Sequence, residues 1–256
     1  MTHATRVART KPAQPGAEGA GSRPATSPAR IAAVMPAWNE AAALGSLLAE
    51  LRTRPGVLLE RVVVVDAHST DATVPVALAG GAQVVTQQRR GYGAACWEGY
   101  QVARRAGATV VVFLDADGSD PPDAIPGLVR PILDGRADLV LGARRAPPGQ
   151  PDPVPWHARA GNRLVCALLW VRTGRRVSDL PSLKAITAAR LDELQLEEMG
   201  YGWTTEMVAK ALRRGLRVRE VPVVTRPRAG GVSKVSGNLA ASVRAGVSLI
   251  RTALRQ

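Results

Sequence analysis

The chain has 256 residues, 46% of them hydrophobic, and this composition excludes a disordered or fibrous protein. Its two cysteines, Cys96 and Cys166, lack CxxC spacing and its three histidines are scattered, so we expect a reducing compartment, no disulfide framework and no zinc site. The net charge of +13 comes from residues 1–30 and 201–256, and such basic ends suit a phosphorylated ligand, an anionic membrane or nucleic acid, or serve solubility alone.

Residues 1–29 are rich in Pro, Ala, Gly and Ser and have no apolar periodicity, so we expect a disordered basic arm. From residue 30 onward, short apolar runs alternate with segments of helical periodicity. This alternation predicts an α/β fold with a mainly parallel sheet covered by helices on both faces. Strands are expected within 30–40, 61–73, 82–88, 109–118 and 137–145, and helices at 40–54, after residue 73, at 92–107 and at 124–135.

The chain changes character near residue 150. A proline-rich connection, 146–156, precedes a predicted amphipathic helix at 157–173. Further strands are expected within 177–186 and 217–228, with a helix at 204–215 between them. We therefore divide the chain into the arm, a domain at 30–237 with halves near 30–149 and 150–237, and an amphipathic helix at 238–256. In that last helix an apolar stripe holds Leu239, Val243, Val247, Ile250 and Leu254, with arginines opposite.

Polar residues follow several of the predicted strands. They occur at 36–40, 66–71, 115–120 and 144–145. Ligands of open α/β sheets bind outside the carboxyl ends of the strands, so these four segments predict one binding crevice.

Three carboxylates lie within the stretch "VVVFLDADGSDPPD". In an extended segment Asp115 and Asp117 point the same way, and carboxylates this close repel one another unless a cation lies among them. A hard divalent cation would suit these oxygens and would neutralise a diphosphate leaving group. Acidic turns are common, however, and an equally weighted alternative makes Asp120 and Asp123 helix N-caps.

Eight short motifs resemble, in order and spacing, the family-2 glycosyltransferases. "VMPAWNE", "VVVVDAHSTDAT", "RRGYGAACWEGY", "VVFLDADGSDPPD" and "LVLGAR" carry the family resemblance, and "VSDLPSLKAI", "GWTTEM" and "RPRAGGVSK" narrow it to the dolichol- and polyprenyl-phosphate-sugar synthase branch. The resemblance covers about 31–237. It implies the nucleotide-sugar-binding GT-A fold, Mg²⁺ or Mn²⁺ as cofactor, and an inverting transfer of a hexose from a UDP-glucose or GDP-mannose type donor to a polyprenyl-phosphate-like acceptor.

The resemblance also implies roles for individual residues. It makes Asp115 and Asp117 the metal ligands, and it names Asp117, Asp179 and Glu206 as catalytic candidates. Asp179 or Glu206 would be a general base for a neutral hydroxyl acceptor, whereas a phosphate acceptor needs none and either acid could then be structural. The implied donor-binding residues are Pro36, Trp38, Glu40, Val65, Asp66, Arg90, Asp115, Ala116, Asp117, Arg144, Arg228 and Lys234.

The chain departs from the family's pattern at four places. The usual "DDGS" is "DAHS", so Ala67 replaces an acid and His68 replaces a glycine. Ser119 stands where many relatives have glutamine. Residues 182–184 read "SLK" where the branch often has Gly-Phe-Arg, so a small soluble acceptor stays open as an alternative. Asp71 is expected to be a turn or helix cap.

Two other functional classes compete with glycosyl transfer. A nucleotidyltransferase would need a glycine-rich phosphate loop near the first strand, and "VMPAWNE" offers none. A nucleic-acid-binding protein lacks support because no recognised module is present and residues 31–200 are electrically balanced.

We expect a cytoplasmic protein without a secretory signal or a membrane span. Residues 164–171 and 238–256 are its means of peripheral contact with the inner face of the membrane, although both could instead pack on the core. The sequence indicates no oligomeric state.

Overall fold

A computed structural model describes residues 1, 28–53, 56, 58–229 and 239–255, with side chains of the last segment described from residue 246. The strands are β1 (Ile31–Ala37), β2 (Leu59–Asp66), β3 (Gln83–Thr86), β4 (Val110–Phe113), β5 (Leu139–Arg145), β6 (Lys184–Thr187) and β7 (Val218–Val224). The helices are α1 (Ala41–Thr53), α2 (Thr73–Ala79), α3 (Tyr92–Arg105), α4 (Ile125–Leu133), α5 (Trp156–Thr173), α6 (Ala188–Leu194), α7 (Trp203–Arg213) and α8 (Leu239–Arg255), with a 3-10 turn, η1, at Pro122–Ala124.

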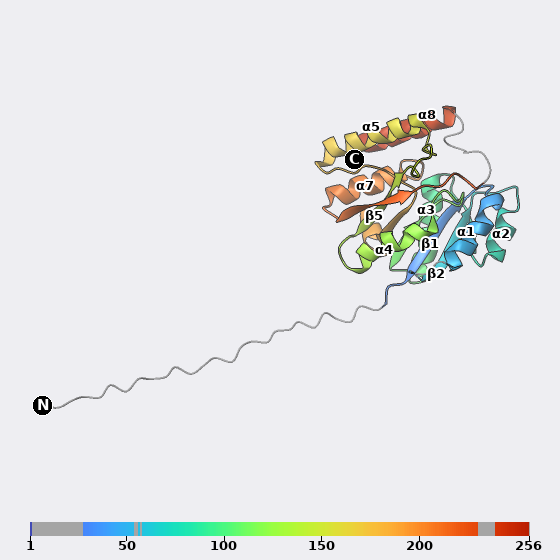
Figure 1. Ribbon diagram of the computed structural model, residues 1–256, viewed down its shortest axis with the longest axis horizontal. Helices are drawn as coiled ribbons and strands as arrows, with labels where there is room; N and C mark the ends of the chain where they lie inside the picture. Colours follow the sequence, from blue (N-terminus) through green and yellow to red (C-terminus); the bar gives the residue numbers. More distant parts are fainter. Residues whose placement is uncertain (2–27, 54–55, 57, 230–238, 256) are drawn as a thin grey trace.

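The strands form one seven-stranded sheet in the order β3-β2-β1-β4-β6-β5-β7, with helices on both faces (Figure 1). β1 pairs in parallel with β2 and β4, and β5 pairs in parallel with β7. The predicted mainly parallel sheet is thus confirmed. β6 alone among these strands runs antiparallel to both of its neighbours, β4 and β5.

The alternation of side chains along the buried strands produces two cores. In β4, Val111 and Phe113 face the core under α3, α5, α6 and α7, whereas Val110 and Val112 face the core under α1, α2 and α4. Burial on both faces explains why these strands are wholly apolar in sequence. A wholly apolar strand offers no polar side chain, so the polar groups of a site lie mainly at the ends of the strands and in the segments beyond them.

The predicted elements differ from the structure in a few places. The strand expected within 177–186 begins only at Lys184, and α6 follows it directly although no helix was expected there. The donor half, 30–149, and the acceptor half, 150–237, share one sheet, because β6 of the second half lies between β4 and β5 of the first. Asp71 is confirmed as a turn and cap residue, since its carboxylate accepts the N–H groups of Ala41 and Thr73.

An ion pair joins the residues just before β5 and β7, with the Asp138 side chain buried and the Arg217 side chain partly exposed. The Asp138 carboxylate accepts Arg217 Nε at 3.0 Å, Nη2 at 2.8 Å and the backbone N–H at 2.9 Å. The hydrogen bonds from the Arg217 side chain lower the pKa of Asp138 to about 2. The charged form is therefore favoured in the folded state, and the stability that it contributes is present above the ordinary pKa near 3.8 and is lost as the pH falls through about 2.

We expect Asp138→Asn to lower the free energy of unfolding by roughly 1–3 kcal/mol at pH 7, because an amide cannot accept all three donors and loses the ionic attraction. Chemical denaturation from pH 7 down to pH 2 measures this. The gap between wild type and variant should narrow as the pH falls. A gap that stays constant over that range would contradict the ionic role, and Asp134→Asn, at an exposed pair with Arg136, is the control.

Candidate active site

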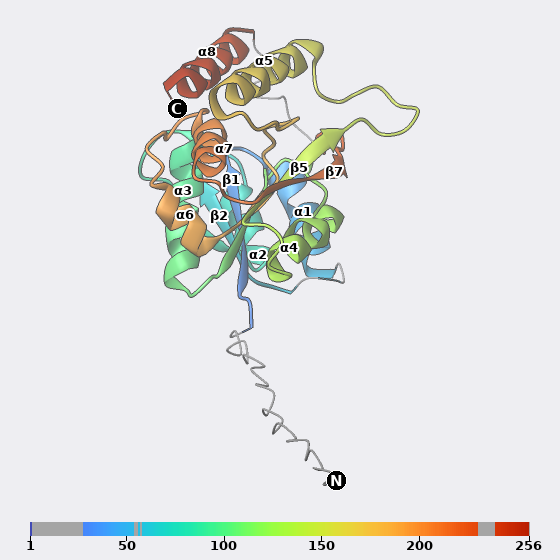
Figure 2. The ribbon, with the colours of Figure 1, turned by 90° about the vertical axis from the view of Figure 1, so that its left-hand side faces the viewer.

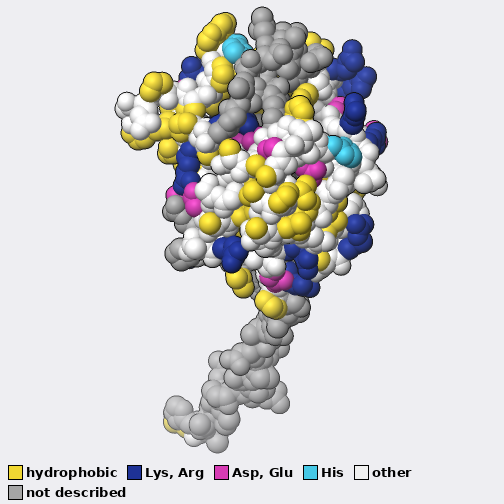
Figure 3. All heavy atoms as spheres, turned by 90° about the vertical axis from the view of Figure 1, so that its right-hand side faces the viewer, with side chains coloured by type: hydrophobic (Ala, Val, Ile, Leu, Met, Phe, Trp, Pro, Cys, Tyr) yellow, Lys and Arg dark blue, Asp and Glu magenta, His cyan; other side chains and the backbone are white. Residues whose placement is uncertain are grey.

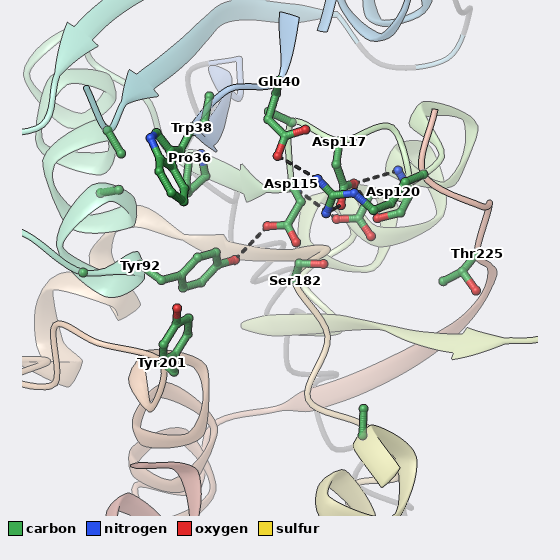
Figure 4. Close-up of a pocket in the computed structure, with 18 of the residues that line it drawn as sticks. Pro36, Trp38, Glu40, Tyr92, Asp115, Asp117, Asp120, Ser182, Tyr201 and Thr225 are labelled. Carbon is green, nitrogen blue, oxygen red and sulfur yellow. Dashed lines mark hydrogen bonds and ion pairs between the residues drawn. The ribbon is translucent and has the colours of Figure 1, made fainter. Parts of the chain in front are cut away.

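A cavity of about 950 Å³ opens at the carboxyl ends of the parallel strands. Figure 4 shows side chains from β1, from the segment after β4 and from the segment before β6 converging on it. The predicted crevice therefore exists. The implied donor-binding residues that line it are Pro36, Trp38, Glu40, Arg90, Asp115, Ala116, Asp117, Arg144 and Arg228.

The acidic segment after β4 is held in place by its own carboxylates. Asp120 Oδ2 accepts the N–H of Asp115 at 3.0 Å, and Asp117 Oδ1 accepts the N–H of Ser119 at 2.9 Å and its hydroxyl at 2.6 Å. The alternative in which Asp120 and Asp123 are helix N-caps is wrong, because neither η1 nor α4 has a side-chain cap. Asp120 instead shapes the loop that presents Asp115 and Asp117.

The carboxylate cluster lacks enough positive charge around Asp115. Burial, and then the charges of Asp120 and Asp117, raise the pKa of Asp115 to about 8. The hydroxyl of Tyr92 donates to Asp115 Oδ1 at 3.3 Å and points from α3 toward the cluster (Figure 4). A carboxylate so short of compensation favours a bound cation.

The donor set fits a hard divalent ion. Asp115 and Asp117 supply two carboxylates, and the described residues include no group of three or more His, Cys, Asp or Glu placed to hold a metal. Mg²⁺ commonly binds proteins through one or two carboxylates and completes its coordination with phosphate oxygens and water. Asp115 and Asp117 would hold the ion here together with a diphosphate.

Arg228 reaches the same cluster from the segment after β7. Its Nη1 lies 2.6 Å from Asp117 Oδ2 and its Nη2 lies 2.7 Å from Glu40 Oε1. Two backbone hydrogen bonds hold that segment against the acidic loop, from Arg226 to Ser119 O and from Ala229 to Asp117 O. Glu40, Asp117 and Arg228 thus form one ion-pair cluster. Lys234, the other basic donor-binding residue that the resemblance implies in this segment, lies outside the described residues.

Arg144 and Asp179 form a bidentate ion pair at the edge of the cavity. Arg144 Nε and Nη2 lie 2.9 and 2.7 Å from the two Asp179 oxygens, and the N–H groups of Arg144 and Leu180 donate to them as well. These bonds hold the pKa of Asp179 below its ordinary value although burial acts to raise it. A carboxylate with four donors and a lowered pKa is a poor proton acceptor. Its geometry fits the structural alternative, in which Asp179 orients Arg144.

Glu206 lies outside the cavity lining. It is buried at the start of α7, where its carboxylate accepts the N–H groups of Glu197 and Glu198 and pairs with Lys210 Nζ at 2.7 Å. These contacts hold the loop whose residue Tyr201 lines the cavity. The geometry again fits a structural acid.

Two implied donor contacts lie behind the cavity wall. Val65 is fully buried in β2, and Asp66 is 4% exposed, with its carboxylate accepting the N–H of Ser69. Ala67 and His68 line the cavity in their place. His68 has a φ of 61°, the left-handed conformation that glycine adopts most readily, which explains why a glycine is usual at this position.

Several cavity residues were not singled out from the sequence. These residues are polar or aromatic and include Gln87, Tyr92, Tyr201 and Thr225. Tyr92 and Tyr201 lie close together on one side of the cavity (Figure 4). The "RRGYGAA" motif contained Tyr92, but nothing in that motif indicated that its hydroxyl would meet Asp115.

A buried lysine supports the segment before β6. Lys184 is 0% exposed, and its Nζ donates to the carbonyls of Pro181 at 3.0 Å and Ser182 at 2.6 Å. It also lies over the rings of Phe113 and Trp203, and burial lowers its pKa. The "SLK" variation therefore replaces an arginine with a lysine whose charge is satisfied inside the protein.

The sequence model of glycosyl transferase family 2 matches residues 32–188, more than half of the chain. The chain belongs to glycosyltransferase family 2. An uncharacterized glycosyltransferase of Mycobacterium tuberculosis is 37% identical over 83% of this chain and 93% of its own length. An undecaprenyl-phosphate mannosyltransferase of Micrococcus luteus is 30% identical over 82% of this chain and 89% of its own length.

Solved structures confirm the GT-A fold of this family-2 glycosyltransferase. Glucosyl-3-phosphoglycerate synthase from Mycobacterium tuberculosis, in complex with phosphoglyceric acid, superimposes with a TM-score of 0.71 at 26% identity, over 89% of this chain and 80% of that one. The same enzyme in complex with Mn²⁺ and UDP-glucose gives a TM-score of 0.71 at 26% identity, over 89% and 79% of the two chains.

The Arg144–Asp179 pair of this glycosyltransferase can be tested kinetically. We expect Asp179→Asn to raise the KM for the sugar donor about tenfold with little change in kcat, because an amide cannot hold Arg144 in the bidentate geometry. Steady-state kinetics across pH would measure this. A large fall in kcat with loss of the acidic limb of the pH–rate profile would instead identify a general base. Asp192→Asn, at the exposed pair with Arg104, is the control.

Proposed function

We propose that this family-2 glycosyltransferase moves a hexose from a nucleoside diphosphate sugar, of the UDP-glucose or GDP-mannose type, to the phosphate of a polyprenyl phosphate. The observation that carries the proposal is the convergence of two carboxylates, Asp115 and Asp117, and two arginines, Arg144 and Arg228, on one cavity. Carboxylates suit a divalent ion and arginines suit phosphate oxygens, and a diphosphate donor requires both.

The chemistry follows from the charges. An oxygen of the acceptor phosphate forms a bond to the anomeric carbon, on the face opposite the leaving group, while the bond from that carbon to the diphosphate breaks. The nucleoside diphosphate leaves with the electron pair. Arg144 and Arg228 would stabilise the charge that develops on it, and a bound Mg²⁺ or Mn²⁺ would neutralise it further. Negative charge that grows in the transition state is where such groups lower the barrier.

The contacts of the two candidate bases, Asp179 and Glu206, support a phosphate acceptor. Asp179 and Glu206 both have their oxygens occupied by donors. A phosphate oxygen is already anionic near neutral pH and needs no proton removed before it attacks. Two relatives 30% identical, the undecaprenyl-phosphate mannosyltransferase and a polyprenol monophosphomannose synthase of Mycolicibacterium smegmatis, have lipid-phosphate names; the second covers 86% of this chain and 87% of its own length.

A small soluble phosphate acceptor is the second candidate. It is favoured by the similarity to glucosyl-3-phosphoglycerate synthase, which was solved with phosphoglyceric acid. The same arginines would serve with either acceptor, because the departing nucleoside diphosphate is the same in both reactions.

A donor and acceptor panel tests the proposal. Radiolabelled UDP-glucose and GDP-mannose are each supplied with Mn²⁺ or Mg²⁺ and with a short-chain polyprenyl phosphate, phosphoglyceric acid or neither. We expect sugar transfer to the polyprenyl phosphate. Product formed only with phosphoglyceric acid would establish the second candidate. If no phosphate acceptor receives sugar from a donor that binds, both are excluded.

A further inference from the structure

Helices α5 and α8 form an outer layer beside the catalytic cavity. They pack against each other and both against α7 (Figures 1 and 2). The side of α5 that faces the protein carries Val165, Cys166 and Leu169, all buried. The expectation that residues 164–171 pack on the core is therefore only half met, because Leu164, Trp170 and Val171 are exposed.

The outward side of α5 carries an apolar stripe, which Arg159 and Arg163, also exposed, flank. Trp156 is 75% exposed and Val171 is 78% exposed. Between them Ala160, Leu164 and Ala167 are also exposed, at intervals of three or four residues, as neighbours on one helix face are. α8 adds exposed apolar side chains of its own. The outward apolar residues of the layer are Trp156, Leu164, Trp170, Val171, Val247 and Leu254.

The two helices that carry this apolar face hold basic and no acidic residues. One acid lies beside them, since Asp152 in the loop before α5 pairs with Arg159 at 2.8 Å. Between residues 156 and 176 the chain has five arginines and no acid, and residues 246–255 add Arg251 and Arg255, also without an acid. The face over α1 and α2 differs, because Asp and Glu side chains lie there among Lys and Arg side chains (Figure 3). A predominantly basic rim around exposed tryptophan and aliphatic side chains is the composition of a helix that lies in an anionic lipid interface.

The layer is continuous with the mouth of the cavity. Pro153, Val154 and Pro155 line the cavity just before α5 begins, and Ala158 lines it from the first turn. Trp156 lies between them in sequence and is exposed. The proline-rich loop before α5 projects from the body (Figure 2). A phosphate headgroup at a surface against the layer would therefore have a short path to Arg144, at the cavity edge.

We propose that the outward face of the α5–α8 layer docks on an anionic membrane surface, a role that rests on the polyprenyl-phosphate acceptor proposed above. No helix among the described residues is long and apolar enough to cross a membrane. Docking would use the buried apolar area of the tryptophans, Leu164 and Val171 together with the attraction between arginines and anionic headgroups. The acceptor phosphate and the cavity would then meet at the interface.

Vesicle co-sedimentation with the full chain tests the docking surface. Vesicles of phosphatidylcholine alone and of phosphatidylcholine with phosphatidylglycerol are compared at low and high salt. The test variant is Leu164→Glu with Val171→Glu, at exposed positions on α5. The matched control is Leu78→Glu with Leu133→Glu, at similarly exposed positions on α2 and α4. Circular dichroism and melting temperatures establish that both variants fold.

We expect wild type and control to bind the anionic vesicles, more weakly at high salt, and the test variant to bind at least about tenfold more weakly. Wild type that ignores anionic vesicles, or a test variant that binds like the control, would overturn the proposal. Light scattering measures the oligomeric state and so tests whether a second copy of the chain binds this face instead. That would be the case if wild type is a dimer, the test variant is a monomer and neither binds vesicles.

The outcome is separable from the proposed function. A water-soluble short-chain polyprenyl phosphate should accept sugar from the test variant as well as from the wild type, because neither substituted residue lines the cavity. Vesicle binding without transfer to any polyprenyl phosphate would support the docking surface and remove the proposed acceptor. Transfer to the short-chain polyprenyl phosphate in solution without vesicle binding would support the proposed acceptor and overturn the docking surface.

Discussion

Asp117→Asn is expected to reduce kcat roughly a thousandfold, the equivalent of about 4 kcal/mol of transition-state stabilisation. The Asp117 carboxylate would be one of two protein ligands of the divalent ion, and an amide is a much weaker ligand for a hard cation. Donor binding should weaken in parallel, and a chelator should weaken donor binding to wild type in the same way. Calorimetric titration of UDP-glucose or GDP-mannose with and without Mn²⁺, together with sugar-transfer rates, measures both effects.

Asp134→Asn is the matched control for this substitution. Asp134 lies at the end of α4, outside the cavity, and pairs with Arg136 on the surface. It should leave transfer and donor affinity unchanged. Donor affinity that is the same in chelator and in Mn²⁺ would remove the metal from the proposed mechanism, even if Asp117→Asn were inactive.

Arg228→Ala should have the second largest effect, a loss of roughly a hundredfold in kcat. Its guanidinium contacts Asp117 and Glu40 directly and would face the departing diphosphate, and removing one donor to a developing negative charge commonly costs this much. The variant should also respond more strongly to metal. With Arg228 gone, its guanidinium no longer competes with the ion for Asp117 Oδ2, so Mn²⁺ should raise the melting temperature more in the variant than in wild type.

Arg226→Ala separates these effects from anchoring of the segment after β7. Arg226 lines the cavity too, but the carboxylates that its guanidinium pairs with, Glu50 at 2.9 Å and Asp123 at 3.7 Å, do not. We expect a much smaller fall in kcat and no enhanced response to Mn²⁺. Equal defects in the two variants would mean that Arg228 acts only by holding the segment in place.

Local patterns were enough to predict most of the fold. Wholly apolar runs identify the strands β1, β2 and β4, and helical periodicity identifies the helices α1, α3 and α7. β6 has no such signal. Its four residues, Lys184–Thr187, include a buried lysine and follow a proline, so neither their limits nor their antiparallel direction could be predicted. Direction is decided by how the chain returns to the sheet from α5.

The sequence predicted which residues reach the cavity from the ends of the strands. It did not predict which hydrogen-bond and ion-pair partners their side chains have. Asp115, Asp117, Arg144 and Arg228 all reach the cavity as the motifs indicated. The occupied state of Asp179 was not predictable, because its partner Arg144 is 35 residues away in sequence. Tertiary packing decides which carboxylate oxygen accepts from a donor that is distant in sequence. The spacing of residues in one sequence does not indicate such a pairing.

The reversed direction of β6 has an evolutionary consequence. Because β6 runs opposite to β4 and β5, the residues that precede it, including Ser182, arrive at the edge where the other strands deliver the residues that follow them. Insertions or exchanges in 174–183 could therefore remodel one wall of the cavity while the loops after β1 and β4 stay unchanged. One donor-handling framework could in this way be adapted to new acceptors by recombination within a single short segment.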